Sequence, residues 1–229
     1  MSVEAVARVV AKPRPGLPRW FEVLAAAGGL LVCAPLLALA ALAVRVSSRG
    51  PVLFRQVRVG RGGRPFTMYK FRTMAAHGSG PQVTASGDPR VTGVGRWLRR
   101  LKLDELPELV NVLRGDMSLV GPRPEVPRYV DLADPLWQAA LTVRPGITDP
   151  VTVRLRHEEE LLAALGADPE THYREVLLPS KLRGYISYLE RRTWWTDLRV
   201  LVETIWAVVM LGRRHTRSGE GVKAPTPDA

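Results

Sequence analysis

Hydrophobic residues are most concentrated in one uncharged segment near the start of the chain, Val23–Val44. As one straight helix its twenty-two residues would be about 33 Å long, enough to cross a bilayer. Pro35 argues against a straight helix, because proline removes an intrahelical hydrogen bond and clashes with the preceding turn. Gly28 and Gly29 weaken the first half of the helix further. We therefore predict that the segment breaks near Pro35.

Basic residues flank this segment on both sides, and lysine and arginine favour the cytoplasmic side of a membrane. A segment that enters the bilayer and returns at Pro35 keeps both flanks on that side, whereas a spanning helix places one of them outside. The flanks favour a re-entrant helix-break-helix over residues 20–46, with a single-pass anchor as the alternative. The basic residues concerned are Arg8, Lys12, Arg14 and Arg19 before the segment and Arg45 and Arg49 after it.

The middle of the chain changes from helical to strand-like patterning. Val52–Val59 and Phe66–Thr73 are rich in Val, Phe, Thr and Tyr, and Gly60–Arg64 between them supplies a flexible turn. This arrangement is typical of a β-hairpin. The small and polar residues of Ala75–Pro89 then predict a loop.

A short amphipathic helix is predicted after the loop. Gly115 stands where a C-terminal cap is expected, and Pro107 is tolerated only in the first turn, which places Asp104 near the N-cap. The predicted helix has about ten residues. Its apolar residues recur at i, i+3, i+4 and i+7: Leu106, Leu109, Val110 and Leu113.

A second apolar stretch, Leu198–Leu211, is too short to span a bilayer and contains Arg199 and Glu203. Tryptophans at 194, 195 and 206 favour the headgroup layer of a membrane, but an ordinary buried helix is the alternative. We predict an α+β fold: a small, mostly helical, membrane-associated domain with a short β-hairpin, a re-entrant helix hairpin and interfacial amphipathic helices.

Charge indicates the kind of partner. The chain has 33 Lys and Arg against 22 Asp and Glu, a formal net charge of +11, and thirteen basic residues against one acid lie between Arg45 and Leu103. Such a block favours nucleic acid, anionic lipid or a phosphorylated substrate. A hydrophobic fraction of 46% excludes disorder for most of the chain, and a single cysteine excludes an internal disulfide framework.

Candidate chemistry is concentrated at Asp104 and Glu105. Free N–H groups at a helix start and the preceding Arg99, Arg100 and Lys102 would allow a phosphate to approach Asp104. Adjacent helix positions point about 100° apart, so two separate roles fit better than a shared proton: one carboxylate attacks phosphorus and the other holds Mg²⁺. The alternative for Asp104 is an ordinary capping carboxylate.

Two rigid turns carry further arginines. Arg123 lies between Pro122 and Pro124, which stiffen its backbone and would let it present a guanidinium to phosphate. Arg144 precedes Pro145 in a second turn of this kind. Either turn alone is equally consistent with a purely structural role.

Five ordered motifs resemble the bacterial sugar transferases, that is, the monotopic polyprenol-phosphate phosphoglycosyl transferases. The resemblance covers roughly residues 18–212 and is specific, because the motifs occur in the same order along the chain. The motifs are Gly50–Gln56, Met68–Met74, Leu103–Leu109, Arg114–Pro124 and Arg144–Thr148.

The resemblance implies an enzyme that moves a phosphosugar from a UDP-sugar to a polyprenol phosphate such as undecaprenyl phosphate, with release of UMP. Asp104 would be the nucleophile of a covalent intermediate, and Glu105 would support a Mg²⁺ cofactor. The expected substrate-binding residues are Lys70, Arg72, Arg99, Arg123 and Arg144. The domain would lie on the cytoplasmic face of the bacterial membrane, in contact with lipid, without nucleic acid, and with a homodimer left open.

The chain also departs from the family pattern. Ala34 replaces a serine common before the breaking proline, and the sequence after Thr148 belongs to another branch, which leaves the sugar open. The expected organisation is a basic extension at 1–19, the hairpin at 20–46, the catalytic domain at 47–212 and a flexible tail at 213–229. Two alternatives are a non-catalytic scaffold that binds polyprenol phosphate and a membrane-anchored nucleic-acid-binding protein.

Overall fold

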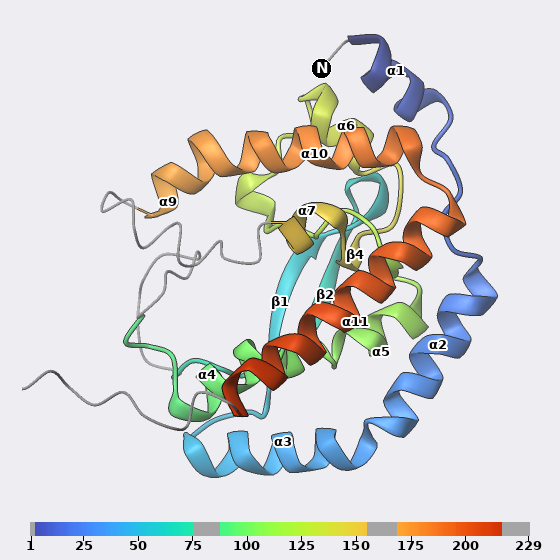
Figure 1. The fold of residues 1–229 in the computed structure, drawn as a ribbon. Coiled ribbons are helices and arrows are strands. Elements are labelled where there is room, and N and C mark those ends of the chain that lie inside the picture. Colours follow the sequence, from blue (N-terminus) through green and yellow to red (C-terminus); the bar gives the residue numbers. More distant parts are fainter. Residues whose placement is uncertain (1–2, 76–87, 155–168, 217–229) are drawn as a thin grey trace, which may run out of the picture.

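The computed structural model describes residues 3–75, 88–154 and 169–216 (Figure 1). The N-terminal half of the described chain contains α1 (Val3–Ala11), α2 (Arg19–Val32), α3 (Ala34–Ser47), β1 (Leu53–Val59), the 3₁₀ turn η1 (Arg61–Gly63), β2 (Pro65–Phe71), α4 (Gly93–Arg100), η2 (Leu103–Glu105) and α5 (Glu108–Arg114). The C-terminal half contains β3 (Ser118–Val120), η3 (Pro127–Tyr129), α6 (Pro135–Ala140), β4 (Gly146–Thr148), α7 (Pro150–Arg154), α9 (Pro169–His172), the π-helical turn η4 (Tyr173–Leu177), α10 (Leu178–Arg191) and α11 (Trp194–Thr216).

The apolar N-terminal segment forms two helices with a sharp bend between them. Helices α2 and α3 are inclined by 62° at Cys33, and Pro35 lies in the first turn of α3, where its missing N–H is tolerated. The predicted break is confirmed. Among the described residues no single helix is long and apolar enough to be a candidate membrane span, but α2 and α3 together meet that criterion.

The predicted β-hairpin is confirmed. Strands β1 and β2 pair antiparallel, with Leu53 opposite Phe71 and Val59 opposite Pro65. The connection uses Gly62 and Gly63 at φ of 67° and 75°, a backbone conformation that glycine adopts without steric cost. Most of the loop predicted at Ala75–Pro89, and the tail after residue 216, lie outside the described residues.

A second, smaller sheet is parallel and was not predicted. Strands β3 and β4 pair Ser118 with Gly146 and Val120 with Thr148. The turn after β3 lies close to the turn before β4: a Cβ on Gly121 would lie 2.5 Å from the Arg144 carbonyl oxygen, so only glycine fits there. The backbones of the turns that carry Arg123 and Arg144 are therefore in direct contact.

The main core lies between the strands and the C-terminal helices. Helix α10 buries Tyr185, Ile186 and Leu189 against α6 and α7, and α1 packs on α10 and α6 through Val6 and Val9. Helix α11 crosses in front of β1 and β2, while α3 runs along the bottom of the molecule and α2 along its right side (Figure 1).

The region after α4 corrects the predicted N-cap. Asp104 is the middle residue of the separate 3₁₀ turn η2, which starts from Lys102 in a left-handed conformation at φ 55°, and α5 starts only after Pro107. The physical reason is that residues 103–105 form a turn of their own, and a new helix begins only after Pro107. Gly115 ends α5 at φ 89°, as predicted.

The buried face of α5 is also different from the expected one. Glu108, Asn111 and Val112 are buried, whereas Val110 and Leu113 are each 38% exposed. The apolar stripe of this helix thus only partly faces the protein, and the polar residues Glu108 and Asn111 face the interior.

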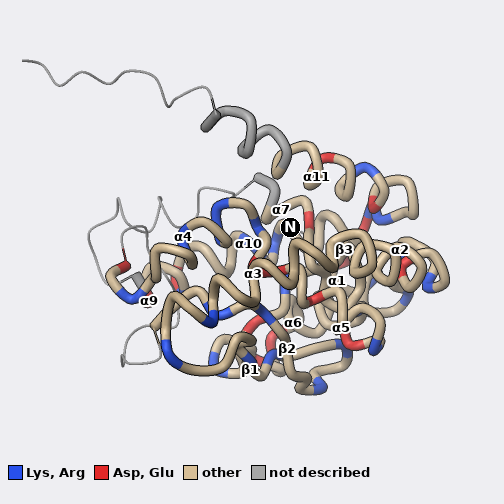
Figure 2. Tube along the Cα trace, turned by 90° about the horizontal axis from the view of Figure 1, so that it is seen from below, with Lys and Arg blue, Asp and Glu red and all other residues tan. Residues whose placement is uncertain are grey.

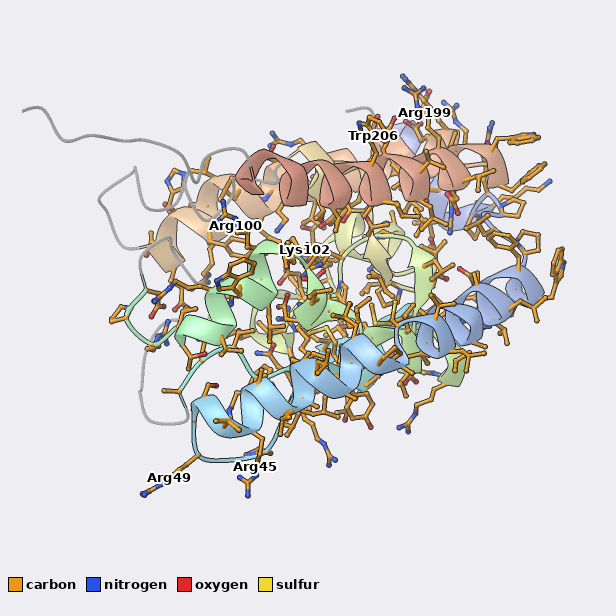
Figure 3. All side chains as sticks on the ribbon, turned by 60° about the horizontal axis from the view of Figure 1, so that its bottom comes forward. Arg45, Arg49, Arg100, Lys102, Arg199 and Trp206 are labelled. Atoms are coloured by element: carbon orange, nitrogen blue, oxygen red, sulfur yellow. The ribbon has the colours of Figure 1, made fainter. Side chains whose placement is uncertain are left out.

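Helix α11 is one helix that extends beyond the predicted Leu198–Leu211 at both ends. Its inner face is held by Asp197, which is fully buried and accepts hydrogen bonds from the Tyr188 hydroxyl at 2.5 Å and the Leu17 N–H at 3.1 Å. Trp206 and Arg199 lie on its outer side (Figure 3), and Trp206 is 63% exposed. The helix is therefore amphipathic rather than fully buried.

Candidate active site

Strand β2 places Lys70 between two acidic side chains. The hydrogen bonds between β2 and α5 fix this strand, because the fully buried Asn111 accepts from the Tyr69 N–H at 3.1 Å and donates to the Thr67 carbonyl at 2.7 Å. Lys70 Nζ then lies 3.0 Å from Glu105 Oε1 and 3.2 Å from Glu108 Oε1. One ammonium group thus joins η2 to α5.

Glu105 has a second cationic partner in Arg123. The Arg123 guanidinium donates to Glu105 Oε1 and to the Ile147 carbonyl, the latter at 3.4 Å. Arg123 reaches this position from the turn after β3, whose Gly121 N–H and Pro122 carbonyl are hydrogen-bonded to the segment 146–148. The structure therefore brings Lys70, Glu105 and Arg123 together, as the sequence predicted.

Asp104 has a different environment from its neighbour. Its side chain is buried, at 7% exposure, and Oδ1 makes no hydrogen bond within the described part of the chain. A buried carboxylate oxygen without a partner is costly unless a ligand satisfies it. We refer to the four side chains Lys70, Asp104, Glu105 and Arg123 as the cluster. The Asp104 oxygen is its clearest open acceptor.

The pKa shifts of the two acids have opposite directions. Burial raises the pKa of Asp104, and the negative charge of Glu105 raises it further, against the opposing effect of Lys70, Lys102 and Arg99. Burial also disfavours ionised Glu105, but Arg123, Lys70 and Lys102 outweigh it and hold the pKa of Glu105 well below its usual value. Glu105 is thus the permanently charged member of the pair.

Glu108 was not predicted as a site residue. It is 1% exposed, and burial raises its pKa against the lowering effect of Lys70. The only available signal in the sequence was its spacing of three and four residues from Glu105 and Asp104, which is one helical turn. An acid in the first turn of a helix is common, so that signal was weak.

Arg99 lies beside the cluster. It lies in the last turn of α4, its Nε donates to Thr73 Oγ1 at 2.8 Å, and its charge lowers the pKa of Asp104. Lys and Arg positions recur along α4 and the β1–β2 hairpin (Figure 2). The electrostatic surroundings of Asp104 are therefore basic, as the charge pattern predicted.

Two arginines predicted to bind substrate lie outside the cluster. Arg72 is buried and donates to the Ser48 carbonyl at 2.7 Å and the Val44 carbonyl at 3.3 Å at the end of α3. Arg144 donates to the Gly115 carbonyl at 2.9 Å, at the opposite end of α5 from Asp104. Cations commonly stabilise the carbonyl end of a helix, so these contacts are structural, and the substrate-binding role of Arg72 and Arg144 stays a prediction.

The acidic pair is compatible with the Mg²⁺ predicted from the sequence. Among the described residues no group of three or more His, Cys, Asp or Glu side chains is arranged to hold a metal ion. Mg²⁺ needs no such cage, because it is commonly bound by one or two carboxylates and the phosphates of a substrate. Asp104 Oδ1 has no hydrogen-bond partner within the described residues. A carboxylate has about four acceptor positions, so Glu105 can still bind a metal ion while it contacts its two cations.

The cluster therefore defines a buried carboxylate among fixed cations, a site suited to a phosphorylated substrate. Residues 14–211 match the family described as bacterial sugar transferase. The chain belongs to this family, and the predicted resemblance is confirmed.

Known relatives are named as sugar transferases, and two of the three given below as transferases of sugar phosphates. The chain is 43% identical over 192 residues to the UDP-glucose:undecaprenyl-phosphate glucose-1-phosphate transferase of Caulobacter vibrioides, covering 82% of the chain and 67% of the relative. It is 44% identical over 198 residues to the UDP-N-acetylgalactosamine-undecaprenyl-phosphate N-acetylgalactosaminephosphotransferase of Aeromonas hydrophila, covering 84% and 44%. A Bacillus subtilis protein named uncharacterized sugar transferase EpsL is 45% identical over 195 residues, covering 85% and 88%. The chain thus spans less than half of the Aeromonas relative but most of the Bacillus one.

Proposed function

We propose that this protein transfers a phosphosugar from a UDP-sugar to undecaprenyl phosphate at the bacterial cytoplasmic membrane. The family and the names of the relatives support the two substrates. The observation that carries the mechanism is the contrast within the acidic pair: Glu105 is paired with two cations, while Asp104 keeps a buried oxygen without a partner.

In the first step, an oxygen of ionised Asp104 attacks the phosphorus bonded to the sugar. A bond forms between this oxygen and phosphorus, and the bond between that phosphorus and the bridging oxygen of the diphosphate breaks, so that UMP leaves with the electron pair. Lys70 faces the charge that develops on the phosphoryl oxygens, whereas Arg123 binds the diphosphate in the substrate and in the transition state alike. Glu105 keeps both cations in place. Fixed charges of this kind stabilise a phosphoryl-transfer transition state without reorganisation.

In the second step, a phosphate oxygen of undecaprenyl phosphate attacks the same phosphorus and releases the Asp104 carboxylate. The product is undecaprenyl diphosphate-sugar, and no net proton transfer is required. Mg²⁺ would be held by Glu105 and by phosphate oxygens of the substrate, and it would neutralise phosphate charge. Splitting the transfer lets one polar and one lipid-bound substrate use the site in turn.

Access to the lipid substrate would come from the α2–α3 pair, inserted as a re-entrant hairpin on the cytoplasmic side. Exposed leucines support insertion, because Leu24, Leu31 and Leu39 are 64%, 77% and 65% exposed. Arg45 and Arg49 point outward at the C-terminal end of α3 (Figure 3), where arginine would contact anionic headgroups. The exposed tryptophans of α11 would lie in the headgroup layer.

The first prediction tests the covalent step. Purified protein, Mg²⁺ and a panel of UDP-sugars are incubated with undecaprenyl phosphate while UMP is recorded. Asp104→Asn removes the nucleophile, and we expect UMP release to fall by at least about a thousandfold. Asp131→Asn, the same change at an exposed position before α6, serves as the matched control and keeps wild-type activity.

A two-step mechanism also predicts an exchange reaction. Without undecaprenyl phosphate, wild-type protein should exchange labelled UMP into UDP-sugar, and intact mass should increase by one phosphosugar. An active Asp104→Asn variant, or turnover with neither exchange nor adduct, would contradict the covalent mechanism.

A further inference from the structure

A buried group of charged and polar side chains lies beside the turn that carries Arg123. We call it the Glu125 cluster: Arg58 of β1, Glu125, Tyr173 of η4 and Lys181 of α10. The Glu125 and Lys181 side chains are 6% and 4% exposed, and Tyr173 is 4% exposed. Burying charged groups is costly unless they are paired, so the contacts among them must be satisfied together.

Glu125 is the acceptor at the centre of the cluster. Its Oε1 accepts a hydrogen bond from the Tyr173 hydroxyl and lies 3.9 Å from Lys181 Nζ. Lys181 Nζ also donates to the Tyr173 hydroxyl at 3.3 Å, and Glu125 Oε2 accepts from Arg58 Nη1 at 3.5 Å. One carboxylate therefore joins β1 to the two C-terminal helical segments.

The cluster also holds the backbone that follows Arg123. Arg58 Nη1 donates to the Pro124 carbonyl at 3.0 Å, and the Glu125 carbonyl accepts from the Val59 N–H at 2.9 Å. The preceding side of the same turn is held by the Gly146 N–H, which donates to the Pro122 carbonyl at 3.0 Å. Hydrogen bonds thus hold the backbone on both the N-terminal and the C-terminal side of Arg123. The Glu125 cluster supplies those on the C-terminal side.

The electrostatic balance of the cluster involves Arg123 itself. Burial lowers the pKa of Arg58, Glu125 opposes this, and the positive charge of Arg123 lowers that pKa further. The negative charge of Glu125 offsets the positive charges of Arg58 and Lys181, and Arg58 also interacts with the charge of Arg123. Loss of that charge would therefore displace cations beside the active site and not only loosen the core.

We infer that Glu125 is a positioning residue for Arg123, which it holds toward the diphosphate of the nucleotide-sugar through Arg58, Tyr173 and Lys181. This inference rests on the proposed function, since it assigns the purpose of the cluster to substrate binding. Its consequence is that the C-terminal segment η4–α10 contributes to the affinity for the nucleotide-sugar without touching it.

The decisive variant is Tyr173→Phe, which removes the hydroxyl donor but keeps the ring. We expect KM for the UDP-sugar to rise about tenfold while kcat changes less than about twofold, because Arg123 would bind substrate and transition state alike. Tyr188→Phe is the matched control: it removes another buried tyrosine–carboxylate hydrogen bond, to Asp197, which joins α10 to α11. The control should lower the Tm and leave KM unchanged.

A charge-balanced rescue separates positioning from stability. Glu125→Gln should raise KM at least as much as Tyr173→Phe, and Lys181→Met added to it should restore KM to within about threefold of wild type by removing one of the buried cations that face Glu125. If Tyr173→Phe lowers Tm but leaves KM unchanged, or if the double variant is no better than Glu125→Gln, the inference is wrong. Wild-type protein that releases no UMP in the same assay would instead overturn the proposed function.

Discussion

Asp104 and Glu105 are neighbours with the same charge, yet the fold stabilises the ionised form of only one of them. Glu105 lies between Lys70 and Arg123, and these contacts stabilise its ionised form. Burial and the charge of Glu105 disfavour ionised Asp104. A nucleophile that is destabilised before the substrate arrives is more reactive toward it, and the same feature reduces the stability of the free protein.

Opposite effects on stability are therefore predicted for two isosteric variants, Asp104→Asn and Glu105→Gln. The folded-state pKa of Asp104 is raised, so its ionised form opposes folding at neutral pH, and Asp104→Asn should stabilise the protein by about 1 kcal/mol at pH 7.5. This gain should vanish as the pH falls through the folded-state pKa of Asp104, where the wild-type side chain becomes neutral. The Tm of wild-type protein and of Asp104→Asn, measured in the same detergent between pH 4 and pH 8, tests this prediction.

Glu105→Gln should act in the other direction. The folded-state pKa of Glu105 is depressed, so its contribution to stability is present above the unfolded pKa, near 4.5, and is lost as the pH falls through the lower folded value. The variant should lower Tm at pH 7.5. A lower Tm for Asp104→Asn at that pH, or an unchanged Tm for Glu105→Gln, would contradict the assigned environments.

At the scale of elements, α5 shows how a polar residue can determine the position of a strand. Asn111 is fully buried and binds both the N–H of Tyr69 and the carbonyl of Thr67. These backbone groups lie on either side of Met68, next to Lys70, so the register of β2 against α5 fixes the ammonium group of the site. The helix thus contributes through its polar face.

We predict that Asn111→Ala costs about 2–3 kcal/mol in the free energy of unfolding, because it removes a fully buried side chain and leaves two partly buried backbone groups of β2 without partners. Leu113→Ala, a change of similar type at a 38% exposed position of the same helix, should cost less than about 1 kcal/mol. Denaturant unfolding of both variants tests this. Equal losses would show that Asn111 does not hold the strand.

The elements that depend on local signals were predictable from the sequence. The β-hairpin follows from its glycine turn, and the bend between α2 and α3 follows from Pro35. The β3–β4 pairing could not be predicted, because each strand has three residues and the two pair across an intervening helix. For the site, the motif residues Lys70, Glu105 and Arg123 were predicted, but Glu108 and Glu125 act through tertiary contacts that no local pattern reveals.

At the scale of the whole molecule, the lengths of α2 and α3 argue for a re-entrant insertion. Each has fourteen residues, about 21 Å of helix, whereas the hydrocarbon core of a bilayer is about 30 Å thick. Neither arm alone is long enough to cross, and the 62° bend turns the second arm away from the direction of the first. Basic residues at both outer ends favour the same side of the membrane.

This arrangement predicts that both flanks are cytoplasmic. With Cys33→Ala as background, single reporters Arg14→Cys and Arg61→Cys are placed at exposed positions before and after the helix pair. A membrane-impermeant maleimide should label both in inside-out vesicles and neither in intact spheroplasts. Labelling of the first reporter from outside would show a spanning segment.

Pro35→Leu should then convert the hairpin into a span. The substitution returns the N–H that a continuous helix needs and removes the ring that clashes with the preceding turn, so we expect the Arg14→Cys reporter to become accessible from outside. Pro15→Leu, a change before α2, is the matched control and should leave both reporters cytoplasmic. If Pro35→Leu also leaves both inside, the basic flanks or the packing of α2 on α5 determine the topology, and the proline only marks the place where the bend occurs.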